Sequence, residues 1–143
     1  MDTDGKPIRF DTKIAVLLRD DLLPWQRLNV CAFLTSGLAA ADPGLTGEPY
    51  VDADDVRYLP MFRQPVLVFQ ASKETLTAAH SRSLRRGITT AVFTSDLFTT
   101  GDDVDNRAAV RALPTGQLDL VGLAVHSARN AVDKVIKGAR MHP

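Results

Sequence analysis

One short apolar segment that ends in charged residues constrains the fold more than any other feature. Residues 14–18 read Ile-Ala-Val-Leu-Leu, and Arg19, Asp20 and Asp21 follow at once. A run this short, with no polar alternation, is typical of a strand that is covered on both faces. A Pro-Trp pair then opens a helical pattern over residues 24–41. A strand followed by a polar junction and a helix indicates an α/β fold, in which sites commonly lie at the carboxyl ends of strands.

The alternation of strands and helices continues to the end of the sequence. Further strands are predicted at residues 66–69, 89–93 and 118–125. Helices are predicted at residues 73–86, 104–113 and 128–138. Their expected N-caps are Ser72, Asp103 and Ser127, and Gly87 is the expected stop of the first of them. The pattern predicts an α/β domain with a mostly parallel or mixed sheet and helices on both faces.

Two segments lie outside this alternation. Residues 1–11 are polar and read as a flexible, solvated tail, which leaves residues 12–143 as a single α/β domain. Residues 50–51 and 56–59 flank an acidic turn and predict a hairpin, and the nearby prolines restrict it to an edge or irregular position.

The charge and hydropathy of the sequence indicate which classes of partner to expect. The 17 basic and 17 acidic residues give a formal net charge of zero, which disfavours a nucleic-acid partner such as tRNA. No apolar run approaches the roughly 20 residues that span a bilayer, so no membrane partner is expected. The N-terminus has no signal-peptide core, and we expect a cytoplasmic protein.

The sequence carries none of the common motifs for cofactor or metal chemistry. His80, His126 and His142 are far apart, and no paired Cys or His motif accompanies them. A GxSxG nucleophile motif and a glycine-rich phosphate loop are also missing. We therefore expect no cofactor and no metal. Cys31 lies in an apolar helical pattern and reads as a buried thiol.

Candidate site residues lie where the first and third predicted strands end. If both strands lie centrally in the sheet and run parallel, the polar groups after them meet at one rim of the sheet. Asp96 could then orient a water or act as a base. The alternative is local: Asp21 would cap the first helix and Asp96 would form an Asx turn. Asn29 on the first helix could bind a ligand or make a buried structural hydrogen bond.

Two other features have a functional and a structural interpretation. Arg82, Arg85 and Arg86 form a solvated helix face or, alternatively, a phosphate site. The helix at 24–41 is apolar around most of its circumference, which predicts deep burial or a subunit interface, and Trp25 would pack there.

Several segments together resemble known families. Three parts of the chain are similar to type II peptidyl-tRNA hydrolases. They are the opening Arg-Asp-Asp-Leu with its helix, the strand at 66–69 with the helix ending at Gly87, and the segment Thr-Ala-Val-Phe-Thr-Ser-Asp96. The segment from Arg19 to Asn29, with the later Tyr50-Val-Asp and Pro60-Met, resembles more closely an uncharacterised bacterial family. That family is catalogued as domain of unknown function two thousand.

The resemblance implies the hydrolase fold, which is a three-layer α/β/α arrangement with a small mixed four-stranded sheet between helices and is commonly a homodimer. The hydrolases cleave the ester between peptide and tRNA, and they use a Lys on the first helix and an Asp after the third strand. Asp96 matches that Asp, whereas Leu28 or Asn29 stands where the Lys is expected and Arg27 is the nearest cation. A cation at that place would stabilise a developing oxyanion, so its loss favours binding over catalysis.

The sequence therefore predicts a module that binds a small or peptide-like ligand at the rim of the sheet. Ligand contacts are expected from Arg19, Asp20, Arg27, Thr94 and Ser95. The alternative is a divergent hydrolase of an acyl ester or amide, and whether the chain is an enzyme stays open at this point. In that alternative Asp96, Asn29 and Thr99 form the catalytic group, with Asp96 positioning a water and Asn29 or Arg27 polarising the carbonyl.

Overall fold

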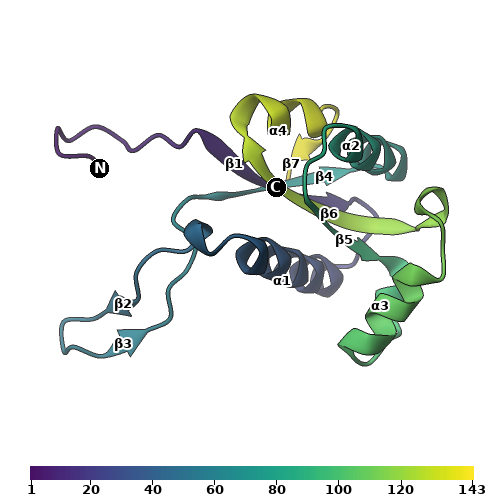
Figure 1. Ribbon diagram of the computed structural model, residues 1–143, viewed down its shortest axis with the longest axis horizontal. Coiled ribbons are helices and arrows are strands. Elements are labelled where there is room, and N and C mark those ends of the chain that lie inside the picture. Colours follow the sequence, from purple (N-terminus) through teal and green to yellow (C-terminus); the bar gives the residue numbers. More distant parts are fainter.

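The computed structural model describes residues 1–143 and places a five-stranded mixed sheet between helices (Figure 1). The sheet runs in the order β5-β6-β1-β4-β7. Its strands are β1 (Thr12–Arg19), β4 (Val66–Ala71), β5 (Thr90–Thr94), β6 (Leu120–Ala128) and β7 (Arg140–Met141). The helices are α1 (Pro24–Ala41), α2 (Lys73–Arg85), α3 (Asp103–Arg111) and α4 (Arg129–Val135). None of these helices is long and apolar enough to cross a membrane.

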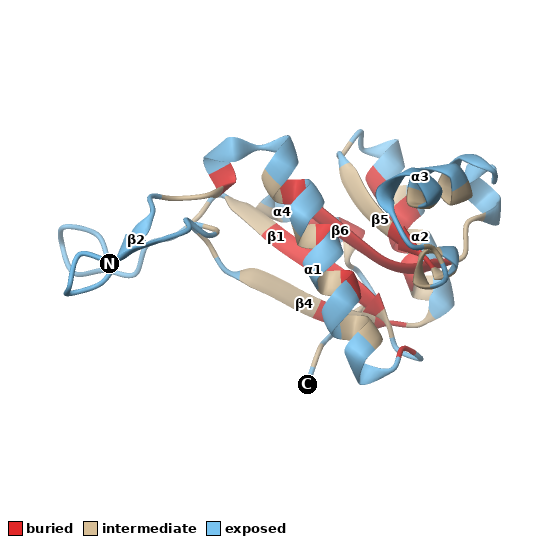
Figure 2. Cartoon of the chain, turned by 90° about the horizontal axis from the view of Figure 1, so that it is seen from below, coloured by how far each residue is buried: buried red, intermediate tan, exposed pale blue.

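Strand β1 is central, and its neighbours explain why its residues 14–18 are all apolar. It pairs parallel to β4 and antiparallel to β6. Ile14, Val16 and Leu18 pack with α1, whereas Ala15 and Leu17 pack with α2 and α4 on the other face. Figure 2 shows the buried residues gathered along β1 and β6. Alternate side chains of β1 therefore supply two separate cores, as expected for a strand covered on both faces.

The direction of the strands positions the site. Strand β5 pairs antiparallel to β6, which itself runs antiparallel to β1. Strands β1, β4 and β5 therefore run the same way, and their carboxyl ends reach one rim of the sheet. The 3₁₀ turn η2 (Ser95–Phe98) follows β5 at this rim, and α3 comes next in the chain.

Several local predictions are confirmed. The Ser72 side chain caps α2 by accepting the backbone N–H of Thr75. Gly87 has a φ of +67° just after α2, a conformation that suits glycine at a helix end. The first helix has the expected bounds, and a hairpin forms from β2 (Tyr50–Val51) and β3 (Arg57–Tyr58).

Four predictions require correction. The sheet has five strands instead of four, because two residues near the C-terminus pair with β4 as β7. Ser127 is not an N-cap, since it lies within β6 opposite Lys13. The side chain that caps α3 is Asp102, which accepts the N–H of Asp105, and not Asp103. Helix α1 is not deeply buried, because only its Val30, Leu34 and Leu38 are fully buried.

The hairpin projects from the body as an arm, defined here as residues 48–61 (Figure 1). Every residue of β2 and β3 is exposed. The turn is held by Asp52, which accepts the N–H groups of Asp54 at 2.9 Å and Val56 at 3.0 Å and the hydroxyl of Tyr58 at 2.8 Å. The arm is thus ordered by its own contacts while its apolar side chains face solvent.

Candidate functional site

An ion-pair cluster occupies the rim where β1 ends and β6 begins. The guanidinium of Arg19 lies 2.7 Å from the carboxylate of Asp21 and 2.8 Å from that of Asp119. It also donates to the carbonyl of Leu120 at 3.1 Å. Lys73, at the start of α2, lies 3.4 Å from Asp119. Asp21 therefore pairs with Arg19 and does not cap α1; the start of that helix is capped by Gln26, whose side chain accepts the N–H of Leu23.

The electrostatics of this cluster fix the charge of Asp119. A hydrogen bond from the Ser95 side chain, together with the cations Arg19 and Lys73, lowers the pKa of the Asp119 carboxyl although partial burial opposes the shift. Asp119 is therefore a carboxylate at neutral pH, held by cations on two sides. A carboxylate stabilised in this way is a weak proton acceptor, so the cluster is suited to holding the rim together.

Arg27 forms a second set of contacts below the rim. Its guanidinium donates to the carbonyls of Leu22 at 2.9 Å and Asp20 at 2.6 Å. Its Nη1 also contacts Gln70 Oε1 at 3.3 Å and His142 Nε2 at 2.8 Å. Arg27 thus ties the β1–α1 junction to β4 and to the C-terminal residues, and a ligand would have to replace these internal contacts.

The last residue of β5 and the residues after it lie in different environments. Thr94 is 1% exposed, and its hydroxyl has no hydrogen-bond partner. The backbone N–H of Ser95 donates to the carbonyl of Asp119 at 2.9 Å. Asp96 is exposed, and its carboxylate makes no hydrogen bond, so no Asx turn forms there. Thr99 is exposed and donates its hydroxyl to the carbonyl of Asp96 at 3.0 Å.

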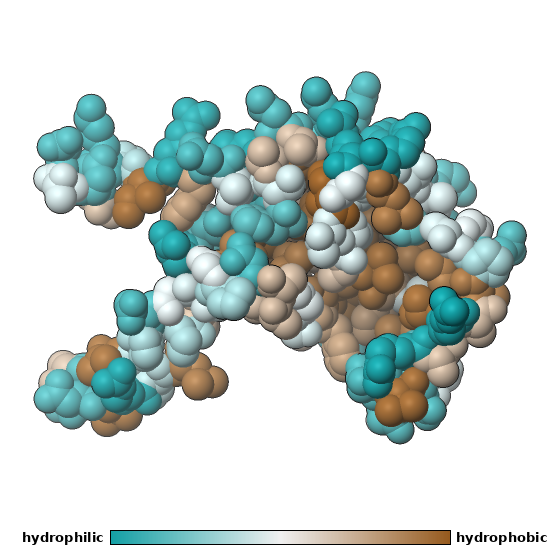
Figure 3. Space-filling view, in the orientation of Figure 1, coloured by the Kyte–Doolittle hydropathy of each residue, from teal (hydrophilic) through white to brown (hydrophobic).

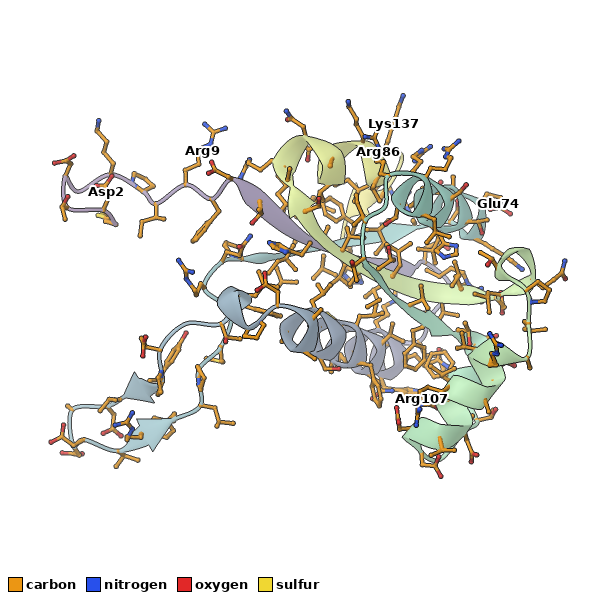
Figure 4. All side chains as sticks on the ribbon, in the orientation of Figure 1. Asp2, Arg9, Glu74, Arg86, Arg107 and Lys137 are labelled. Carbon is orange, nitrogen blue, oxygen red and sulfur yellow. The ribbon has the colours of Figure 1, made fainter.

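A groove of about 830 Å³ opens beside this rim, between α1, β5, η2 and α3. Asn29 lines it, whereas Asp96 and Thr99 do not. The structure therefore does not bring the three predicted catalytic residues together in one cavity. Figure 3 shows apolar atoms gathered between α1 and α3, and Figure 4 shows Arg107 at the α3 side of the same space.

Aromatic side chains form one wall of the groove. Trp25 packs edge-on against Phe98, with ring centroids 5.8 Å apart. Phe98 packs on Phe93 at 5.2 Å, and Phe93 packs on Phe33 at 5.7 Å. Trp25 and Phe33 stay 56% and 51% exposed, although aromatic side chains of this size usually bury most of their surface. The wall therefore presents apolar surface to whatever enters the groove.

Polar groups with free hydrogen-bonding capacity face this wall. The amide of Asn29 and the guanidinium of Arg111 make no side-chain hydrogen bond within the chain. Asn106 uses only its Oδ1, which accepts from the Thr100 hydroxyl, and its amide NH₂ stays free. Arg107 pairs with Asp103 in its own helix at 2.9 Å. The groove thus combines an apolar wall with unpaired donors, which is the usual composition of a ligand site.

The sequence identified only part of this groove. Asn29 was a candidate, and Trp25 was expected to serve in packing. The contribution of α3 was missed, because nothing in the residues 103–111 shows that this helix faces α1. Asp119 of the ion-pair cluster, which lies outside the groove, was also missed, since it was read as part of an apolar strand. No group of three or more His, Cys, Asp or Glu side chains is arranged to hold a metal ion. Cys31 is half-buried, and burial raises the pKa of its thiol.

Fold and groove together define a mixed α/β protein with an amphipathic groove beside β5, between α1 and α3. Residues 12–143 match the family described as protein of unknown function (DUF2000), and the chain belongs to that family. This confirms the closer of the two resemblances found in the sequence. The second, to the fold of type II peptidyl-tRNA hydrolases, stays a prediction.

One solved structure is very similar over almost the whole chain. It is described as a protein of unknown function from Agrobacterium tumefaciens, with 44% sequence identity and a TM-score of 0.91. The match covers 94% of this chain and 100% of that one. No curated protein matches the chain.

Proposed function

We propose that the protein binds a peptide-like ligand in the groove between α1 and α3. The observation that carries this proposal is the pairing of an exposed aromatic wall with unpaired amide and guanidinium donors. The groove volume of about 830 Å³ lies within the range of small-molecule and cofactor pockets. A ligand with an apolar side chain and nearby carbonyl or carboxylate oxygens satisfies both parts of the groove.

Each part of the groove has a specific role in this proposal. Trp25 and Phe98 bury the apolar side chain of the ligand. The amides of Asn29 and Asn106 donate to its carbonyl oxygens. Arg111, on the last turn of α3, pairs with its carboxylate, because a guanidinium binds a carboxylate through two parallel hydrogen bonds.

The single tryptophan makes the test simple. Trp25 is the chain's only Trp and lies in the groove wall, so its fluorescence reports occupancy without a label. We expect N-acetylated peptides with an aromatic or branched C-terminal residue to change the emission of Trp25 and to raise the melting temperature. Asn29→Ala and Arg111→Ala should weaken binding. Asn130→Ala, at an exposed position on α4, is the matched control. A panel that changes neither signal would overturn the proposal.

Hydrolysis is the second candidate, and one observation favours it. The Asp96 carboxylate is exposed, free of hydrogen bonds and located where the parallel strand β5 ends. A free carboxylate at this place is available as a base for water. Peptidyl-tRNA and simple acyl esters are the substrates to assay. Turnover that Asp96→Asn abolishes without loss of folding would replace the binding proposal, and equal turnover in both proteins would exclude this role of Asp96.

We also propose that the arm makes the protein a homodimer. Its exposed apolar side chains are Tyr50, Val51, Val56, Tyr58, Leu59 and Met61. A lone two-stranded hairpin is marginally stable in water, which favours a docked arm. The exposed side of α1, where Leu28 is 75% exposed, is unpartnered in the same chain. A two-fold dimer lets each arm cover the partner's α1, because the same two patches then meet twice.

The arm leaves from one end of α1, and α3 lies near the other end (Figure 1). The helix spans roughly 27 Å between them, so an arm that points away from the body does not reach its own groove. Sedimentation analysis should give a dimer that Leu59→Asp converts to a monomer. Leu59 is 83% exposed, so this change leaves the fold of one chain intact. Leu84→Asp on α2 is the control, and a wild-type monomer at high concentration would contradict the proposal.

A further inference from the structure

A hollow lined only by cations lies where α2 and α4 end. Its volume is about 390 Å³, and the five side chains that line it are Arg82, Arg85, Arg86, Lys134 and Lys137. In Figure 4 the side chains of Arg86 and Lys137 rise from the same side of the molecule. In Figure 3 this side is covered by hydrophilic atoms. No apolar or acidic residue contributes to the lining.

The chain provides no counter-charge for these cations. Its five ion pairs involve other basic residues, namely Lys13, Arg19, Lys73 and Arg107. Asp133 precedes Lys134 in α4 but pairs with Lys13, 2.5 Å away. Acidic residues are as numerous as basic ones in the whole chain. The absence of acids at the hollow therefore reflects a separation of charge over the surface.

A structural explanation accounts for only part of this charge. Cations are favoured at helix C-termini, and Arg82 donates to the carbonyls of Val135 and Lys137 at the end of α4. Each helix end carries about half a negative charge. The two helix ends together then offset about one of the five positive charges. Arg82 has a structural role, whereas the other four side chains have no partner within the chain.

The geometry points to a binding site for a compact anion that carries several phosphate groups, such as an inorganic oligophosphate. Guanidinium groups bind phosphate through paired hydrogen bonds, and lysine adds a mobile point charge. The hollow has no aromatic or apolar side chain on which a base could stack. Recognition therefore depends on the phosphate chain and not on an attached nucleoside.

The confined size of the hollow favours a short anion over a nucleic acid. A nucleic acid needs a basic track that follows its backbone over many phosphates. Here the cations are gathered between two helix ends, and the net charge of the chain is zero. This site lies on the face of the sheet covered by α2 and α4, opposite α1, so it is separate from the groove proposed for a peptide-like ligand.

Titration calorimetry with tripolyphosphate at low salt tests the site. We expect saturable binding that added sodium chloride weakens, because salt screens exposed charges. The double variant Arg85→Gln with Lys137→Gln should lose affinity by about tenfold, since each substitution removes a charged contact. Both residues are exposed and unpaired, so the variant should melt like the wild type. Arg57→Gln on the arm is the matched control.

Competing ligands distinguish the sources of phosphate. ATP should bind about as tightly as tripolyphosphate, because the hollow offers nothing to its base. An undiminished affinity in the double variant, or no heat of binding for the wild type, would overturn the proposal. A short RNA that displaces tripolyphosphate at far lower concentration would also overturn it in favour of nucleic-acid binding. Binding of the peptide panel is expected to be unchanged in the double variant.

Discussion

Arg19 and Asp119 form an ion pair of 2.8 Å although 100 residues separate them in the sequence. The Arg19 side chain is 13% exposed and the Asp119 side chain is 37% exposed, so water screens the pair in part. The pair joins the end of the central strand to the start of β6. It therefore connects the two parts of the chain that must come together before the rim exists.

The pair predicts a stability that depends on acid pH. The pKa of Asp119 is lowered in the folded protein, so its carboxylate stabilises the fold above its unfolded pKa of about 3.9. This contribution is lost as the pH falls through the lower, folded pKa. Asp119→Asn should destabilise the protein by about 0.5–1 kcal/mol at pH 7 in urea unfolding, because the Asp119 side chain is 37% exposed and water weakens the ion pair. The difference in free energy of unfolding between the variant and the wild type should disappear as the pH falls below about 4. A difference that is independent of pH would show that the Asp119 charge is not its cause.

The close packing of α1 on Gly122 predicts that a larger residue at this position destabilises the fold. An added Cβ would meet Val30 Cγ1 at 2.6 Å and Leu34 Cδ1 at 3.1 Å. Gly122→Ala should therefore destabilise the protein by about 1–3 kcal/mol, because the core has to shift to admit a methyl group. Gly116→Ala is the matched control, since nothing lies within 4 Å of its added Cβ. Equal melting temperatures for the two variants would show that α1 moves freely over the sheet.

At Thr94 we expect a substitution that stabilises the protein. Its buried hydroxyl has no partner, and an unsatisfied polar group in a core is unfavourable. Thr94→Val keeps the shape and removes the hydroxyl, so we expect a gain of about 1 kcal/mol in the free energy of unfolding. Differential scanning calorimetry gives the readout. A loss of stability would mean that the hydroxyl has a partner, such as an ordered water.

The contacts of Arg27 predict that its substitution lowers the stability of the fold without weakening ligand binding in the groove. Arg27→Met leaves the carbonyls of Leu22 and Asp20 without their donor, and it should cost about 2–3 kcal/mol. Arg27→Lys should recover only part of the lost stability, because one ammonium cannot replace the planar set of donors of a guanidinium. Urea unfolding followed by circular dichroism measures the free energy of unfolding of both variants. The groove ligand should bind the folded Arg27→Lys protein normally; a selective loss of ligand affinity would make Arg27 a binding residue.

Local signals were sufficient for most of the fold. The apolar run at residues 14–18 identified the central strand because burial on both faces removes alternation. Ser72 and Gly87 marked the ends of α2 through their own chemistry. Strand β7 could not be predicted, since Arg140 and Met141 are both exposed and only pairing with β4 makes them a strand. Ser127 misled the prediction because its pairing with Lys13 outweighs its preference for a helix start.

The candidate site was less predictable, because it depends on contacts between distant segments. The parallel direction of β1 and β5 placed their ends at one rim, as the alternation of elements suggested. The partners of Arg19 and Arg27 were not foreseeable, since Asp119 and His142 lie far along the chain. The groove needs α3 to sit beside α1, and the sequence of α3 is amphipathic without indicating its neighbour.

The central position of β1 has a consequence for synthesis of the protein on the ribosome. Thr12 to Leu18 emerge early, but one edge of this strand waits for β4 and the other for β6, where Thr12 pairs with Ala128. Until then this buried strand has an open edge, a state that favours self-association of nascent chains. Cooperative folding of the sheet must therefore follow translation of β6, and until then β4 is the only strand that can cover an edge of β1.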